Sequence, residues 1–198
     1  TEITAHRGSS KMAPENTMAA LEAAMEEMAD YSEIDVQTTA DGIVVLCHDL
    51  NLKRVAGVDR TLGSMTYSQL EQLDVGSHFS PEFKGERIPT LREVLEACKG
   101  RMKLNIELKN IGNDTSLPEQ VAALVKEYDM EDQCVITSVK LKYLERVKDM
   151  NPDLRTGYIL AAAYGNYYES GDFDFISIRS SFAGRRLVEA VHEDGKAI

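Results

Sequence analysis

Two acidic residues stand two positions apart in an apolar run, within the segment EIDVQTTADGIVVLCHD at residues 33–49. Alternate residues of a strand point to the same face, so Glu33 and Asp35 would share one face while their apolar neighbours share the other. Two carboxylates side by side repel each other, and a hard divalent cation relieves that repulsion by binding both. The segment, which closes with His48 and Asp49, therefore predicts half of a metal-dependent active site.

Further polar residues fall at the ends of other predicted strands. The first predicted strand ends at His6 and Arg7, and the segment KLNIELK at residues 103–109 places Glu107 and Lys109 on one face. Taken singly, each has a structural explanation: Glu107 and Lys109 could form a simple ion pair, and a lone histidine is usually exposed. Polar residues that could do chemistry recur at the ends of four predicted strands, and structural need alone does not readily explain that recurrence. In barrels, the carboxyl ends of the strands gather at one mouth, where such residues would meet.

The order of predicted elements favours a parallel α/β sheet covered by helices. Strands are predicted at residues 2–6, 33–36, 43–47, 103–109, 135–137, 156–159 and 175–178, and residues 196–198 look like the start of another. Most of them are separated by helical periodicity, and the first strand lacks a glycine-rich nucleotide loop. Seven strands and a beginning eighth favour a TIM-type (β/α)8 barrel, truncated before the eighth strand is complete.

The link between the second and third predicted strands leaves their pairing open. Residues 38–42 contain Asp41-Gly42, a hairpin signal, whereas a parallel crossover needs about a dozen residues. The strands therefore form an antiparallel hairpin, or the chain loops back without a helix. Residues 50–89 are rich in glycine and proline around one short helical piece, and we interpret them as a small insertion in a single barrel domain spanning residues 1–198.

Composition limits the partners. The net charge of −11 argues against nucleic acid or an anionic membrane surface, although it says nothing about one local patch. No run is apolar enough to cross a bilayer. We expect this stretch to be soluble. The location of a longer parent protein is unknown, and cytoplasmic and membrane-tethered parents both stay open. Three widely spaced cysteines without a CxxC motif predict buried free thiols: Cys47, Cys98 and Cys134.

The ordered motifs resemble the glycerophosphodiester phosphodiesterase family, and the resemblance covers essentially the whole chain. The matching segments are His6-Arg7-Gly8, Pro14-Glu15-Asn16-Thr17, Glu33-x-Asp35-Val36, Asp41-Gly42, His48-Asp49, Ile88-Pro89-Thr90-Leu91 and the IELK at Ile106–Lys109. The resemblance implies a (β/α)8 barrel that hydrolyses small-molecule glycerophosphodiesters to glycerol phosphate and an alcohol. It also implies an insertion after the third strand.

The resemblance also implies roles for individual residues. Glu33, Asp35 and Glu107 match ligands of a divalent cation, Mg²⁺ or Ca²⁺. His6 and His48 match an acid/base pair. The positions that contact the phosphate are matched by Arg7 and Lys109. Which histidine is the acid, and whether water or a substrate hydroxyl is the nucleophile, stays open.

One departure concerns the last strand, which in the family commonly carries a tryptophan-containing segment; this chain has no tryptophan. An incomplete barrel leaves open edges and exposed apolar surface. We therefore expect weak or no activity from this stretch, and compensation by a homodimer or by strand exchange. A cluster of three tyrosines near a strand end either lines a pocket or packs: Tyr164, Tyr167 and Tyr168.

Two alternatives to the glycerophosphodiesterase stay open. One is another phospholipase-type phosphodiesterase on the same barrel, and the other is a non-catalytic module that binds a phosphodiester or a metal. Turnover with and without a chelator separates an enzyme from a module.

Overall fold

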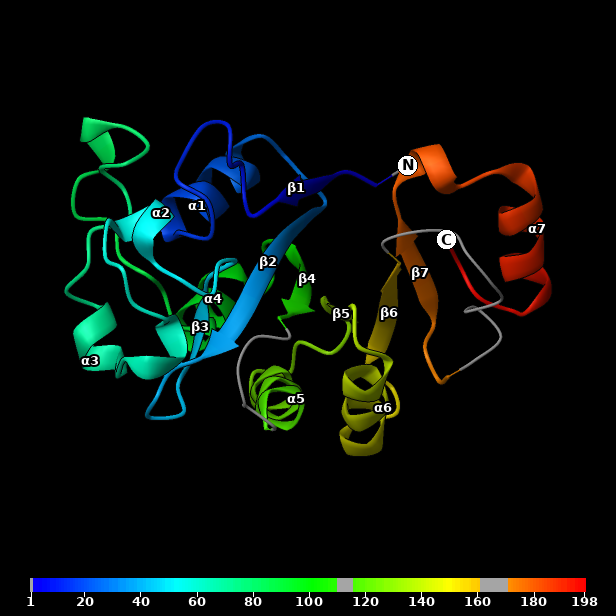
Figure 1. Cartoon of the computed structure of the whole chain (residues 1–198). Coiled ribbons are helices and arrows are strands. Elements are labelled where there is room, and N and C mark those ends of the chain that lie inside the picture. Colours follow the sequence, from blue (N-terminus) through cyan, green and yellow to red (C-terminus); the bar gives the residue numbers. More distant parts are fainter. Residues whose placement is uncertain (1, 110–115, 161–170) are drawn as a thin grey trace.

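The computed structural model describes residues 2–109, 116–160 and 171–198. Within these segments, six strands form one parallel sheet in the order β1-β2-β4-β5-β6-β7 (Figure 1). The strands are β1 (Thr4–His6), β2 (Tyr31–Thr38), β4 (Lys103–Leu108), β5 (Cys134–Ser138), β6 (Arg155–Leu160) and β7 (Phe175–Ile178). The predicted α/β fold of the TIM type is confirmed.

Helices alternate with these strands. They are α1 (Met18–Glu26), α4 (Leu91–Cys98), α5 (Leu117–Glu127), α6 (Leu141–Met150) and α7 (Arg185–Glu193). A capping box begins α4: the Thr90 hydroxyl accepts from the Glu93 amide at 3.2 Å, and the Thr90 amide donates to the Glu93 carboxylate at 2.8 Å. Helices α5 and α6 lie side by side along the sheet (Figure 1).

The third predicted strand is not a barrel strand. β3 (Val44–Leu46) pairs antiparallel with β2, so the open question about the link is answered in favour of a hairpin. Gly42 turns the chain with a φ of +82°, and five linking residues are too few for a parallel crossover. The count of seven barrel strands was therefore wrong by one. Ala197 pairs in parallel with Phe175 of β7, which confirms the predicted start of another strand, now in seventh place.

One face of the sheet carries apolar side chains and the other carries polar ones, because successive side chains of a strand point to opposite faces. On one face, fully buried aliphatic side chains of β2 and β4 join apolar residues of α4 and α5 in the main core. The strand residues in that cluster are Ile34, Val36, Leu104, Ile106 and Leu108. The opposite face carries Glu33 and Asp35, which pair in register with Asn105 and Glu107. The helices thus cover the apolar face and leave the polar face free for chemistry.

Short elements fill residues 50–89, between β3 and α4. They are α2 (Lys53–Ala56), η1 (Leu62–Ser64), α3 (Tyr67–Leu70) and η2 (Pro81–Phe83); a further short helix, η4 (Ser180–Phe182), follows β7. Apolar side chains from residues 52–88 form a second cluster with Val45 and Cys47, at the end of the hairpin. Whether residues 50–89 are an insertion stays a prediction, as do the homodimer and the strand exchange.

All three cysteines are free and buried, as expected. In the part of the chain that the structure describes, every helix is too short or too polar to cross a bilayer.

Candidate active site

Three carboxylates meet on the polar face of the sheet. β2 supplies Glu33 and Asp35, and β4 supplies Glu107 in register with Asp35. One oxygen from each lies within 4.8 Å of the others. Glu33 and Asp35 are only 7% and 1% exposed. The structure thus brings together the three residues that the sequence singled out as metal ligands.

Glu33 is a buried carboxyl next to a second carboxylate, and this environment disfavours its charged form. Burial, followed by the charge of Asp35, raises the pKa of Glu33 to about 8. One of its carboxylate oxygens accepts from the Arg7 amide at 2.9 Å, and the other is buried without a partner among the described residues. A buried orphan oxygen beside two more carboxylates fits a hard divalent cation with oxygen ligands.

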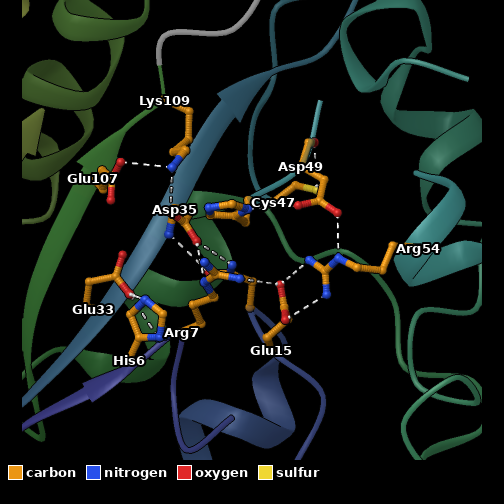
Figure 2. Close-up of polar contacts among 12 residues, drawn as sticks. His6, Arg7, Glu15, Glu33, Asp35, Cys47, Asp49, Arg54, Glu107 and Lys109 are labelled. Carbon is orange, nitrogen blue, oxygen red and sulfur yellow. Dashed lines mark hydrogen bonds and ion pairs between the residues drawn. The ribbon is translucent and has the colours of Figure 1, made fainter. Parts of the chain in front are cut away.

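Two cationic side chains border the same carboxylates (Figure 2). Lys109 Nζ lies 2.9 Å from a Glu107 oxygen and 3.3 Å from an Asp35 oxygen. Burial alone would lower the pKa of Lys109, but its contacts with Glu107 and Asp35 outweigh that effect and raise it. Arg7 Nε lies 3.4 Å from the other Asp35 oxygen, and Arg7 adopts a left-handed φ of 58°. Both predicted phosphate-binding residues thus lie at the acidic cluster.

The two predicted acid/base histidines lie at the ends of β1 and β3. His6 Nε2 is 3.8 Å from Glu33, and its imidazole is largely exposed. Partial burial and the charge of Arg7 lower the pKa of His6, and a positive charge on His48 also lowers it. His48 Nδ1 lies 2.8 Å from an Asp49 oxygen, and because a carboxylate only accepts, Nδ1 carries the proton.

Sequence reasoning missed an asparagine that holds Asp35. Asn16 Nδ2 donates to an Asp35 oxygen at 2.9 Å, and Asn16 Oδ1 accepts from the Asp35 amide at 3.1 Å. Its φ of 55° is left-handed, which asparagine tolerates better than most residues. The sequence identified residues 14–17 only as a segment shared with the resembling family, with no role for Asn16. The left-handed bend turns Asn16 into the site.

A chain of ion pairs was also missed. Glu15 accepts from Arg7 at 3.0 Å and from both terminal nitrogens of Arg54, at 2.6 and 2.9 Å. Arg54 Nε donates to Asp49 at 2.6 Å (Figure 2). No spacing in the sequence connects Arg54 with Glu15, 39 residues away, so only the fold reveals the pair. The tyrosines at 164, 167 and 168 lie outside the described residues.

The amino-acid sequence matches a known family. The model of the glycerophosphoryl diester phosphodiesterase family matches residues 6–197. The chain belongs to this family. The predicted class of enzyme, a phosphoric diester hydrolase of the glycerophosphodiester phosphodiesterase type, is thereby confirmed, since this match and relatives up to 40% identical agree.

Individual relatives support the assignment. A glycerophosphodiester phosphodiesterase of Caldanaerobacter subterraneus is 40% identical over 80% of this chain and 66% of its own length. The human lysophospholipase D GDPD3 is 32% identical over 91% of this chain, which spans 58% of that protein. A solved phosphodiesterase of Oleispira antarctica, in complex with the product sn-glycerol-3-phosphate, is 32% identical with a TM-score of 0.88, covering all of this chain and 84% of that one.

Proposed function

We propose that the chain hydrolyses small-molecule glycerophosphodiesters to glycerol phosphate and an alcohol, in a reaction that depends on a divalent cation and a pair of histidines. The observation that carries the proposal is the cluster of Glu33, Asp35 and Glu107 within 4.8 Å, beside the His6 imidazole and two cationic side chains, those of Arg7 and Lys109. The product named for the Oleispira antarctica neighbour, sn-glycerol-3-phosphate, has the chemistry expected of this site.

The three carboxylates would hold the cation, Mg²⁺ or Ca²⁺. The family generally depends on divalent cations, and the oxygen-only ligand set with a partnerless buried Glu33 oxygen suits either ion. When bound, such an ion polarises the phosphoryl oxygens and offsets the charge of the transition state. Asn16 fixes the orientation of Asp35 through two hydrogen bonds, as partners of metal ligands commonly do.

Arg7 and Lys109 would bind the phosphate. Both side chains already lie against Asp35 and are mostly buried, so their charges are poorly screened by water. Arg7 presents a planar fork that matches two phosphate oxygens, whereas Lys109 presents a point charge. Each can exchange part of its contact with a carboxylate for a substrate oxygen, which keeps the buried charges paired.

The histidines would move the protons. One takes the proton of the nucleophile and the other protonates the leaving alkoxide, roles that an imidazole with a pKa near neutrality can fill. Burial and the charge of Arg7 lower the pKa of His6, which favours its neutral imidazole. The Nδ1 proton of His48 is donated to Asp49, which leaves Nε2 as its reactive nitrogen.

Turnover of a glycerophosphodiester, with and without chelator, tests the proposal. His6→Ala and His48→Ala are expected to lose about 10²–10⁴-fold in kcat. A p-nitrophenyl phosphodiester, whose leaving group needs no proton, should restore much of the rate in the variant that lacks the general acid. Chelator-resistant turnover, or full activity of Glu33→Ala, would refute the metal role. Failure to restore either histidine variant would refute the acid/base pair.

A lysophospholipid is the second candidate substrate, because the human relative is named a lysophospholipase D. Parallel assays of glycerophosphocholine and lysophosphatidylcholine separate the two activities by their kcat/KM. Tight binding of both without release of choline would instead support a non-catalytic module.

A further inference from the structure

Residues 50–89 send one side chain into the candidate active site. We propose that Arg54 of helix α2 is a positioning residue that fixes the tautomer and orientation of His48 through Asp49. This inference rests on the proposed function, in which His48 transfers a proton, and it adds a residue outside the acid/base pair, the carboxylates and the phosphate contacts.

The geometry forms a relay of two contacts. Arg54 Nε donates to one oxygen of Asp49 at 2.6 Å, and the other oxygen of Asp49 lies 2.8 Å from His48 Nδ1. Each carboxylate oxygen therefore has its own partner, so the carboxylate cannot rotate without breaking one contact. The carboxylate stays charged, because its hydrogen bond to Arg54 lowers the pKa of Asp49 to about 2. A fixed, charged acceptor at Nδ1 leaves Nε2 of His48 free for proton transfer.

A second carboxylate holds the other end of Arg54. Its two terminal nitrogens bind both oxygens of Glu15, at 2.6 and 2.9 Å, in a bidentate pair. Burial raises the pKa of Glu15, but the hydrogen bond from Arg54 and the charge of Arg7 outweigh it and keep Glu15 ionised. The guanidinium is thus fixed by Glu15, which contacts Arg7 as well. Arg54 has three contacts with two carboxylates, a pattern that a lysine ammonium cannot reproduce.

The neighbouring residue on the same helix offers a matched control. The side chain of Lys53 is 73% exposed and pairs only loosely with Asp59, at 3.8 Å. Arg54 is 46% exposed, so neither side chain fills the core under α2. Removing the charge of Lys53 changes the helix as much as removing that of Arg54, but leaves the relay intact. A difference between the two variants therefore reports the contacts of Arg54 rather than the stability of α2.

The experiment compares Arg54→Gln, Arg54→Lys and Lys53→Gln by steady-state kinetics and by ¹⁵N NMR of the histidine ring nitrogens. For Arg54→Gln we expect a fall in kcat of about 10–100-fold with little change in KM, the usual effect of losing a residue that orients a reacting group. Arg54→Lys should recover part of the loss, and Lys53→Gln should match the parent chain. The ring spectrum of His48 should change from the Nδ1-protonated form to a mixture in Arg54→Gln, change less in Arg54→Lys, and match the parent chain in Lys53→Gln.

A double variant and one comparison complete the test. Because Arg54 acts through Asp49, adding Arg54→Gln to Asp49→Asn should lower kcat less than twofold further. The inference is overturned if Arg54→Gln keeps its kcat, or if its kcat falls while the His48 ring spectrum is unchanged. His48→Ala separates the two proposals. An inactive His48→Ala beside a fully active Arg54→Gln refutes the role of Arg54 alone, whereas full activity of His48→Ala refutes the proposed function.

Discussion

Binding of a cation at the three-carboxylate cluster is expected to release about one proton at pH 7. Burial and the neighbouring Asp35 raise the pKa of Glu33 to about 8, and the residue is only 7% exposed. At pH 7 about 0.9 of the Glu33 carboxyls are protonated, and the proton must leave when the carboxylate becomes a ligand. At pH 9 the expected release falls to about 0.1, because Glu33 is already ionised.

Isothermal titration calorimetry measures this release directly. Metal-free protein is titrated with Ca²⁺ in two buffers of different ionisation enthalpy, at pH 7 and at pH 9, and the slope of observed against buffer enthalpy gives the number of protons. Glu145, which is exposed on α6, provides the control: Glu145→Gln should leave the release unchanged. A release below about 0.3 protons at both pH values would refute the shifted pKa of Glu33.

The same group contributes to the pH dependence of stability in the metal-free protein. Between pH 4.5 and about 8 the Glu33 carboxyl is more protonated in the folded protein than in the unfolded chain, so its contribution to the unfolding free energy falls as pH rises through that window. Since a tenfold change in a proton equilibrium is worth about 1.4 kcal/mol, the fall is at most about 5 kcal/mol. Glu33→Gln should flatten the curve in urea denaturation, and an equally steep curve in that variant would contradict the assignment.

Three further predictions concern single contacts. Asn16→Gly keeps the left-handed backbone but removes both hydrogen bonds to Asp35, so calorimetry should show cation affinity about 10–100-fold weaker; unchanged affinity would contradict the orienting role. Leu104→Ala should lower the unfolding free energy by about 2–5 kcal/mol in urea, because the side chain is fully buried. It should leave kcat of the folded protein unchanged, since Leu104 faces away from the carboxylates, and a large loss of kcat would show that the two faces are coupled. Thr90→Ala should cost about 0.5–2 kcal/mol through loss of the α4 cap, and a loss below about 0.3 kcal/mol would show that the cap contributes little.

The residues on regular strands could be predicted from the sequence because the period of two decides which face they occupy. Glu33, Asp35 and Glu107 lie on the strand face that points away from the helices, and their apolar neighbours pack against the helices. The pairing of β2 with β4, which brings Asp35 beside Glu107, did not follow from this pattern, because the third predicted strand was expected between them. The pattern therefore contains the fold class and the face of each acidic residue, whereas the cluster of three needed the family resemblance and the structure.

The residues on irregular segments could not be predicted in this way. Asn16 points into the site only because its backbone is left-handed, and Arg54 meets Glu15 only because the chain between them folds back. Neither the left-handed backbone of one residue nor the folding back of the chain produces a periodic pattern in the sequence. The strand count failed for a related reason: an apolar run such as Val44–Leu46 is equally compatible with a barrel strand and with the return arm of a hairpin, and only the length of the link decides.

The hairpin of β2 and β3 ties His48 to both apolar clusters. Val44 and Leu46 are buried in the main core, and Val45 and Cys47 are buried in the second cluster. β3 is also bridged from Val45 to Thr90, and the Leu46 amide donates to the Pro89 carbonyl. Segments that open locally have few buried apolar contacts, so this arm is expected to keep its amides protected from hydrogen exchange together with the sheet. The position of His48 therefore depends on the integrity of both clusters at once.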